Sequence, residues 1–153
     1  MLACRGSYVA RVDPDAGPAR LETIARDECV HLLETRQVGR LGFLQGAELM
    51  ILPVNYVVDG EIVVFRTDPG AKLEGAPLSR VAFEVDAIDP ATRQGWSVLI
   101  RGVGEELTPA YRKAYERARS LPIESWSPGE KQHWVRIVPT HITGRRLTRT
   151  GGD

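Results

Sequence analysis

The sequence predicts a mainly β protein, a six-stranded antiparallel barrel with a few helices. Three observations support this prediction. Six short runs rich in β-branched and aromatic residues occupy most of the chain after residue 37. Turn signals separate neighbouring runs, and few helical segments lie between them, which favours antiparallel pairing over alternating βαβ units. At 153 residues the chain has the usual length of one domain, so one hydrophobic core is expected.

The first part of the chain changes character near residue 20. Residues 1–20 contain two glycines and two prolines without a sustained period, and we interpret them as a flexible lead-in. From Leu21 to Arg36 apolar residues recur at roughly helical spacing among charged ones, with acidic residues in the first turn. This pattern predicts an amphipathic helix that ends near Gln37.

The six β-rich runs follow one another with turns between them. Asp59-Gly60 is the strongest hairpin signal in the chain, because this dipeptide favours the tight turn whose twist matches paired strands. Gln45-Gly46 predicts a second turn. The runs are Val38 to Leu44, Leu49 to Val58, Glu61 to Thr67, Arg80 to Ile88, Trp96 to Leu107 and His133 to Leu147.

Two helical segments are expected to interrupt the strands. A very short one covers Pro69 to Glu74, and a longer one with an apolar side covers Pro109 to Ser120. The stretch Leu121 to Gly129 contains two prolines and is predicted to be a loop. The expected domain therefore covers residues 21–148, followed by a tail at 149–153.

Composition limits the classes of function. Acidic and basic side chains balance at twenty each, so the chain lacks the overall positive charge typical of nucleic-acid binding proteins. Cys4 and Cys29 form no CxxC pair and have no histidine at ligand spacing, which argues against a metal site or a disulfide framework. No run approaches the roughly 18 apolar residues of a membrane span, and the start lacks the apolar core of a signal peptide. We therefore expect a cytoplasmic protein with no nucleic-acid or membrane partner.

The stretch from Val63 to Gly75 joins a predicted strand end to a very short helix. Asp68 is a favoured N-cap residue, Pro69 suits the first helical position, and Gly75 suits a left-handed helix end. Unpaired amides at such a helix start attract anions. Three side chains nearby add positive charge or a hydroxyl group: Arg66, Thr67 and Lys72. Two interpretations stay open on this spacing: the turn holds a phosphate, or Asp68 caps the amides while the arginine and lysine are solvated surface charges.

One long run, Pro53 to Leu73 (PVNYVVDGEIVVFRTDPGAKL), resembles the FMN-binding core of the pyridoxamine 5'-phosphate oxidase-like split-barrel flavoproteins. The likeness continues in order through GRLGF, VAFEVD, GWSVLIRGVGEEL and HWVRIVPTHITGRRL, and covers nearly everything after residue 20. It is closest to small nitroreductase-like and uncharacterised actinobacterial-type members. The substrate-binding arginine and histidine pattern of the oxidase itself is not recognisable in the final GRRLTRTGGD, so vitamin B6 oxidation is not expected.

The resemblance implies a homodimer of six-stranded split barrels with flavin sites in the groove between subunits. Three segments would meet the FMN: a strand along the isoalloxazine ring, a strand end and turn at the ribityl chain and phosphate, and the start of a later strand. The implied cofactor-binding residues are, in that order, Pro53, Val54, Asn55 and Tyr56; Phe65, Arg66, Thr67 and Lys72; and Trp96 and Ser97.

Ala71 departs from the family pattern, because many relatives have a threonine or serine before the lysine. One hydroxyl donor to the phosphate is therefore missing. A neutral hydrogen bond contributes about 1 kcal/mol and a charge-assisted one about 1.5 to 3 kcal/mol, so we expect weaker binding rather than its loss.

The implied function is that of a flavin-dependent oxidoreductase that reduces a small organic substrate with electrons from a nicotinamide or another donor. The flavin brings the redox chemistry, so no protein nucleophile, general base or metal is required, and no catalytic residue is identified. Two alternatives stay open: a deazaflavin-dependent reductase that uses the same groove, and a flavin or haem binder without turnover.

The remaining polar residues have mainly structural interpretations. His31 fits the surface of the first helix, whereas His133 could face the flavin pocket. Glu84 and Asp86 alternate with apolar residues and are predicted to face solvent. Four strand arginines are expected to form ion pairs at the surface or in the dimer: Arg101, Arg136, Arg145 and Arg146. Three tryptophans could each lie in the core, in the interface or in the pocket wall: Trp96, Trp126 and Trp134.

Overall fold

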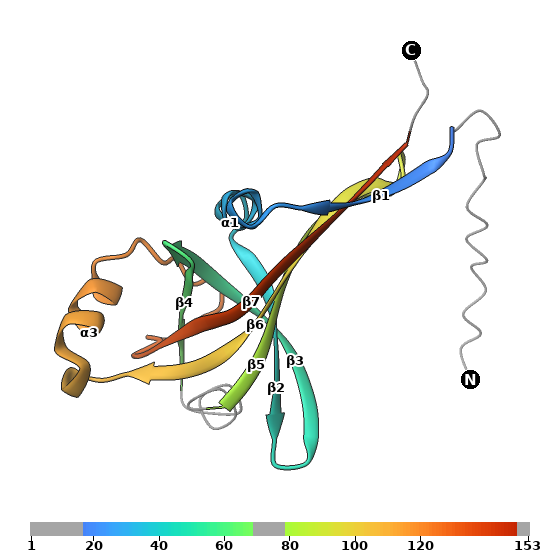
Figure 1. Ribbon diagram of the computed structural model, residues 1–153. Coiled ribbons are helices and arrows are strands. Elements are labelled where there is room, and N and C mark those ends of the chain that lie inside the picture. Colours follow the sequence, from blue (N-terminus) through green and yellow to red (C-terminus); the bar gives the residue numbers. More distant parts are fainter. Residues whose placement is uncertain (1–16, 69–78, 150–153) are drawn as a thin grey trace, which may run out of the picture.

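The structure, a computed structural model, describes residues 17–68 and 79–149 of the chain. Seven strands form one antiparallel sheet, and the described helices lie outside it (Figure 1). The prediction of a mainly β fold is confirmed. The elements are β1 (Ala19–Ile24), α1 (Arg26–Glu34), β2 (Val38–Gln45), β3 (Glu48–Asp59), β4 (Ile62–Thr67), β5 (Ser79–Asp89), β6 (Gln94–Leu107), the 3-10 helix η1 (Pro109–Tyr111), α3 (Arg112–Arg119) and β7 (His133–Arg149).

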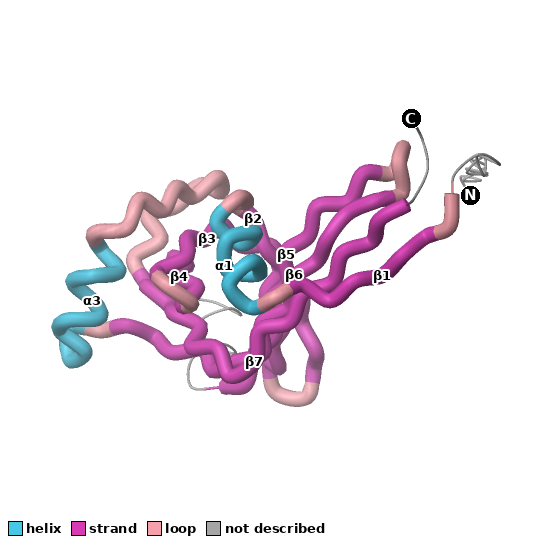
Figure 2. The backbone as a smooth tube through the Cα atoms, turned by 45° about the horizontal axis from the view of Figure 1, so that its top comes forward, coloured by secondary structure: helices cyan, strands magenta, loops and turns pink. Residues whose placement is uncertain are grey.

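The sheet closes into a ring, which confirms the predicted antiparallel barrel. The strand order is β1-β7-β4-β3-β2-β5-β6, and β6 pairs with β7 as well. The last strand makes this closure possible, because its first residues pair with β4 and β6 and its last residues pair with β1 and the start of β6. Beyond the ring, β1 and the adjoining ends of β5, β6 and β7 extend as an arm (Figure 2).

Both predicted hairpin turns are present. Gly46 and Gly60 have φ values of +62° and +66°, the left-handed region that glycine adopts without a steric cost. They connect β2 to β3 and β3 to β4, where Gln45 pairs with Glu48 and Asp59 with Ile62. The six predicted strands all form, with ends within two residues of the predicted ones.

The predicted start of the first helix is wrong. Residues 21–24 belong to β1, and α1 begins only at Arg26. Leu21 pairs with Leu147 and Ile24 with Gly144, so a ladder with a strand far along the chain overrides the local helical spacing. The ladder also includes Ala19 and Arg149, so the pairing of β1 with β7 extends beyond the predicted boundaries at 21 and 148.

The later helix and loop agree with their predictions. η1 and α3 together cover residues 109–119, and a segment without regular structure follows as far as residue 132. The short helix predicted at Pro69 to Glu74 lies outside the described residues. In the described part of the chain, no helix is long and apolar enough to span a membrane.

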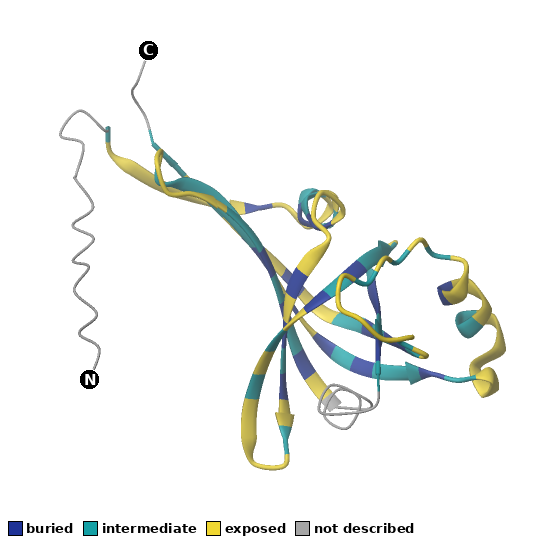
Figure 3. Cartoon of the chain, turned by 180° about the vertical axis from the view of Figure 1, so that it is seen from behind, coloured by how far each residue is buried: buried dark blue, intermediate teal, exposed yellow. Residues whose placement is uncertain are grey.

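Two apolar clusters lie on opposite sides of the barrel wall. The main core fills the ring with aromatic and branched side chains from every strand, including fully buried Phe43, Phe65 and Phe83. A smaller cluster lies outside β4, under α3, where Val64, Leu107, Ala118 and Trp134 are buried. Figure 3 shows this alternation of buried and exposed positions along the strands. The smaller cluster matters for the site, because it also packs against Ile123 at the start of the loop after α3.

Candidate functional site

A pocket of about 450 Å³ lies where β3, the end of β4 and the loop between α3 and β7 meet. Five of the ten residues predicted to contact the cofactor line it: Pro53, Val54, Asn55, Arg66 and Thr67. The other lining residues are Val38, Leu52, Ile123, Ser125, Trp126, Ser127 and Lys131. On the side of β2 and β3 the pocket lining is mainly apolar. Among the described lining residues there are two cationic side chains and no carboxylate.

Strand alternation explains how β3 and β4 contribute to the pocket. Along β3 the side chains of Val54 and Tyr56 are buried, while Pro53 and Asn55 lie on the outer side. Tyr56 pairs with Phe65 on the neighbouring strand, so Arg66 and Thr67 follow on the ladder beside Asn55. Asn55 and Arg66 therefore reach the pocket from the outer face of the barrel, whereas Val54 and Thr67, which also line it, are buried. The pocket lies next to the cluster under α3, because Ile123 belongs to both.

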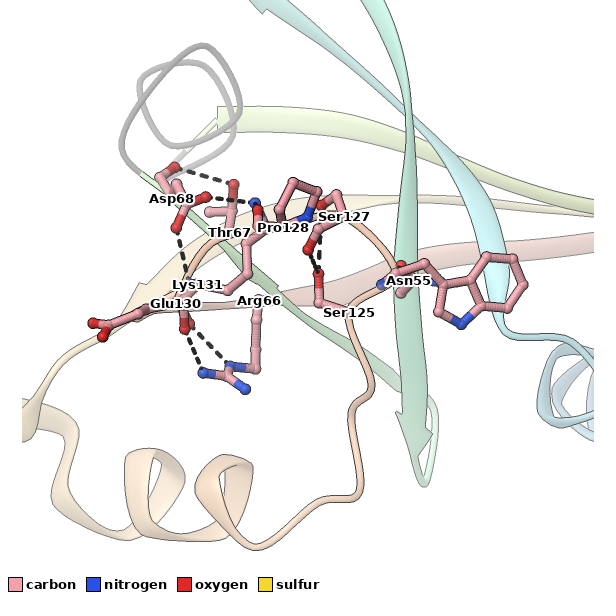
Figure 4. A network of polar contacts seen from close by, with 10 residues as sticks. Asn55, Arg66, Thr67, Asp68, Ser125, Ser127, Pro128, Glu130 and Lys131 are labelled. Carbon is pink, nitrogen blue, oxygen red and sulfur yellow. Dashed lines mark hydrogen bonds and ion pairs between the residues drawn. The ribbon is translucent and has the colours of Figure 1, made fainter.

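A polar network fixes the loop that forms the far wall of the pocket (Figure 4). The Asn55 side-chain oxygen accepts a hydrogen bond of 3.0 Å from the backbone N–H of Trp126. The Arg66 guanidinium donates from Nε to the Lys131 carbonyl at 2.9 Å and from Nη2 to the Glu130 carbonyl at 2.8 Å. The same guanidinium lies 5.0 Å from the centre of the Trp134 ring, within the range of a cation–π interaction.

Asp68 and Lys131 form the second half of this network. The Lys131 backbone N–H donates to Asp68 Oδ1 at 2.9 Å, its ammonium group forms an ion pair with the same carboxylate, and Nζ also donates to the Pro128 carbonyl at 3.0 Å. The hydrogen bond from the Lys131 ammonium, partly offset by desolvation, lowers the pKa of the Asp68 carboxyl below its ordinary value. In Figure 4, Asp68 and Lys131 lie beside the Arg66 contacts and close the network around the loop.

These contacts bear on the two interpretations of the turn at Val63 to Gly75. Arg66 is bound to the loop backbone and stacked on Trp134, so it is not simply a solvated surface charge. The described hydrogen bonds of the Asp68 carboxylate go to Lys131. The predicted helix start at Pro69, the lysine at position 72 and the alanine at position 71 lie outside the described residues.

Two other predicted cofactor residues lie in the barrel interior. Phe65 is fully buried, and Tyr56 is nearly so. The Tyr56 hydroxyl donates a 2.6 Å hydrogen bond to the Leu33 carbonyl at the end of α1, and burial raises the pKa of this phenol. Neither side chain lines the pocket, so any contribution they make to it passes through the backbone of β3 and β4.

Trp96 and Ser97 are adjacent on β6 and face opposite sides of the sheet. The Trp96 ring packs against the main core, and the Arg36 guanidinium lies 5.8 Å from its centre. Ser97 pairs with Asp86 on one neighbouring strand and with Arg145 on the other. Neither residue lines the pocket within one chain.

The other polar residues mostly have partners outside the pocket. His31 is exposed on α1, as predicted, and lies 3.7 Å from Glu34. His133 Nδ1 lies 2.8 Å from Glu106 Oε1, and this histidine does not line the pocket. Half-exposed Glu84 and Asp86 both bind Arg40, which agrees with their predicted outward position. The ion pairs predicted for two of the strand arginines are present as Arg136–Glu105 and Arg146–Glu28.

The loop residues Ser125, Ser127 and Lys131 were not identified from the sequence as site residues. Trp126 was one of three tryptophans for which the core, the interface and the pocket wall stayed open, and it lines the pocket. A loop has no hydrophobic period, so its side chains cannot be assigned to one face. Only its turn residues gave a signal, and Gly129 indeed has a φ of +109°. That the loop folds back to β3 and β4 depends on contacts across more than 60 positions of the chain.

A second pocket of about 790 Å³ lies on the outer face of the barrel, beside the β2–β3 hairpin. Three strongly exposed apolar side chains form one part of its rim: Leu44, Leu49 and Ile51. Leu44 pairs with Leu49, and Ile51 pairs with Gly42, so these side chains are neighbours on one face. The exposed positions of this hairpin are visible in Figure 3.

Comparisons with known proteins show which family and which structures this chain resembles. The family model described as pyridoxamine 5'-phosphate oxidase matches residues 25–146. An uncharacterised protein of Mycobacterium tuberculosis is 34% identical over 145 residues, which are 90% of this chain and 91% of that protein. The structure of the FAD binding protein from Mycobacterium smegmatis is 34% identical with a TM-score of 0.62, over 83% of this chain and 98% of that one. A conserved protein of unknown function from Corynebacterium diphtheriae is 28% identical with a TM-score of 0.69, over 84% and 98%.

Proposed function

The chain belongs to the pyridoxamine 5'-phosphate oxidase family, and from this premise we propose that it binds FMN and reduces a small organic substrate at the flavin. The observation that carries the proposal is the pocket beside β3, which joins apolar walls to a cationic end built from Arg66 and Lys131. FMN has the same division, with a flat ring system at one end and a phosphate at the other.

The residues present fit such a ligand. A volume of about 450 Å³ lies within the range of roughly 300 to 1,000 Å³ for pockets that enclose drug-sized molecules. Val38, Leu52 and Val54 offer apolar surface for the ring. Among the described residues, the hydrogen bonds of Arg66 go to two loop carbonyls, which leaves three of its five N–H donors for a phosphate. The FAD-binding relative from Mycobacterium smegmatis, at 34% identity, supports a flavin as the ligand class.

A bound flavin supplies the hydride and electron transfer chemistry itself. The chain then has to bind the cofactor, orient its ring and limit access of water. In this proposal the β3 backbone around Pro53 and Asn55 faces the polar edge of the ring, while Arg66 and Thr67 hold the phosphate end. No protein nucleophile or general base is needed.

We further propose that two copies form a homodimer through the outer face of β2 and β3. Leu49 is 72% exposed and Ile51 is 64% exposed on this face, beside Leu44. Apolar patches rimmed by polar residues mark interaction sites, and Arg101 and His141 lie on the opposite rim of this pocket. In a symmetric dimer a partner copy could bring Ser97 to the flavin, which this residue does not reach within its own chain.

The visible spectrum of the purified protein, with added cofactor where needed, tests the cofactor. We expect the bands of an oxidised flavin after incubation with FMN and removal of the excess by gel filtration. A protein that retains deazaflavin but not FMN would instead support the deazaflavin reductase, and a Soret band after incubation with haem would support a haem binder. A protein that retains no flavin of any kind would refute the proposal.

Anaerobic reduction tests the activity. We expect bleaching of the flavin band by a nicotinamide donor and reoxidation by small nitroaromatic or quinone acceptors, with no turnover of pyridoxamine 5'-phosphate. If no donor reduces the bound flavin, the reductase proposal fails while flavin binding stands.

A further inference from the structure

Lys131 has a backbone conformation that is unusual for its residue type. Its φ is +43°, in the left-handed region that side chains other than glycine, asparagine and aspartate seldom occupy. Such a conformation costs free energy and persists where the surroundings fix it, most often at functional sites. Lys131 lines the pocket, so the unusual backbone lies where a ligand would bind.

Its surroundings fix this residue at both backbone groups and at the ammonium. Its backbone N–H binds Asp68, its carbonyl accepts from Arg66, and its ammonium group contacts the Asp68 carboxylate and the Pro128 carbonyl. The side chain is only 15% exposed, whereas most surface lysines extend into solvent. The structure therefore holds an ammonium group in the pocket wall at the expense of its hydration.

These contacts do not engage all the N–H donors of the ammonium group. A lysine has three N–H donors, and two of them are engaged by Asp68 and Pro128. Within the described residues the third donor has no partner. Asp68 forms an ion pair with this group, and it offsets one of the two positive charges that Arg66 and Lys131 bring to the pocket.

We propose that the Asp68–Lys131 pair determines how strongly the pocket binds a phosphate group, with Lys131 donating to the phosphate and Asp68 reducing the net positive charge. The inference rests on the proposed function, because it takes the phosphate of FMN as the group bound. It assigns a specificity role to two residues that were not among those predicted to contact the cofactor. The pair selects between flavins by charge: FMN carries a phosphate and riboflavin does not.

The two single variants should change FMN affinity in opposite directions. Asp68→Asn keeps the shape and removes the negative charge, so we expect FMN to bind about threefold to tenfold more tightly. Lys131→Met removes the donor and leaves the carboxylate unpaired, so we expect FMN to bind about tenfold to a hundredfold more weakly, the range of one charge-assisted hydrogen bond. In the double variant the two changes oppose each other, so its FMN affinity should lie between those of the two single variants. Riboflavin affinity should stay within about twofold throughout.

Flavin fluorescence titration of both ligands against all four proteins is the measurement. If the pair only holds the loop in place, each variant, Asp68→Asn and Lys131→Met, will bind FMN and riboflavin more weakly to the same extent. That result would overturn the proposal. The increase in FMN affinity expected for Asp68→Asn is the decisive result, because damage to the fold does not increase affinity. Asp59→Asn is the matched control: it breaks the ion pair with Arg117 at the β3–β4 turn, away from the pocket, and should leave both affinities unchanged.

Failure of the proposed flavin binding would give a different result from failure of the Asp68–Lys131 proposal. If wild-type protein binds neither flavin, the flavin assignment falls, and the same variants are titrated with inorganic pyrophosphate by thermal shift. Stronger stabilisation of Asp68→Asn and weaker stabilisation of Lys131→Met would then support the pair as a phosphate site in its own right. Equal shifts in all four proteins would overturn it.

Discussion

Arg66 has two roles that the sequence could not separate. Its position at the end of a predicted strand indicated a phosphate contact, and in the structure it lines the candidate pocket. It also donates two hydrogen bonds to the backbone of residues 130 and 131, and so holds the pocket wall in place. Sequence reasoning identified the residue because the family pattern contains it. It missed the loop contacts because they join segments far apart in the chain.

Replacing Arg66 should therefore affect both binding and stability. We expect Arg66→Ala to weaken FMN binding at least about tenfold, and riboflavin binding much less, because the lost charge faces the phosphate. Arg66→Lys is the control, since it keeps the charge but not the planar fork. On the family resemblance alone, we expect Lys72→Ala also to weaken FMN binding more than riboflavin binding. Equal losses for both ligands would remove the phosphate assignment.

The pH dependence of stability should reveal the Asp68–Lys131 pair. Lys131 lowers the pKa of Asp68 in the folded state, so the pair stabilises the fold above the ordinary carboxyl pKa. That contribution is lost as the pH falls through the lowered folded pKa. We expect Asp68→Asn to be less stable than the wild type near pH 7 and the difference to shrink in acid. Urea unfolding at a series of pH values measures this, and a gap that does not change with pH would contradict it.

At the scale of elements, β1 shows where local patterns mislead. Leu21 and Ile24 are three residues apart, a spacing that suits one face of a helix, and the adjoining segment does form α1. Their strand conformation depends on β7, more than 100 positions later, which no local window contains. Strands β2, β3 and β4 were predictable because glycine turns join them and apolar residues alternate along β2 and β3. The adjacent residues Trp96 and Ser97 show a further limit, because strand alternation sends them to opposite faces.

The contact between α1 and β3 can be tested with one hydroxyl group. The buried Tyr56 hydroxyl donates to the Leu33 carbonyl in the last turn of the helix. We expect Tyr56→Phe to lower the free energy of unfolding by about 1 kcal/mol, the usual net contribution of such a hydrogen bond. Tyr111→Phe on the exposed η1 is the control and should change stability little. Urea denaturation of both variants measures the difference, and equal stabilities would show that the helix end is held by packing alone.

At the scale of the whole molecule, the prediction of an antiparallel barrel is confirmed, but the exact closure was beyond the sequence. The closure of the ring depends on the long β7, which pairs with three other strands. The residue pattern of β7 does not indicate which strands these are. The location of the pocket follows from that closure, because β7 brings the loop after α3 back to the end of β4. The homodimer stays a prediction.

The proposed dimer face gives a test of assembly. We expect the wild type to have the mass of two chains by size exclusion with light scattering. Ile51→Asp places a charge in the centre of the apolar patch and should give single chains. Tyr111→Asp changes another exposed large hydrophobic residue, on η1, and should leave the mass unchanged. A monomeric wild type, or an Ile51→Asp variant that still pairs, would exclude this face.

The position of β7 in the chain has a consequence for biosynthesis. It follows all the other described elements, yet it pairs with β4, with β6 and with β1 near the amino-terminal end. Until β7 has been synthesised, β4 and β6 each present an unpaired edge and the barrel cannot close. Exposed strand edges of this kind can pair with other chains, so the unfinished barrel is the form of this protein most exposed to aggregation.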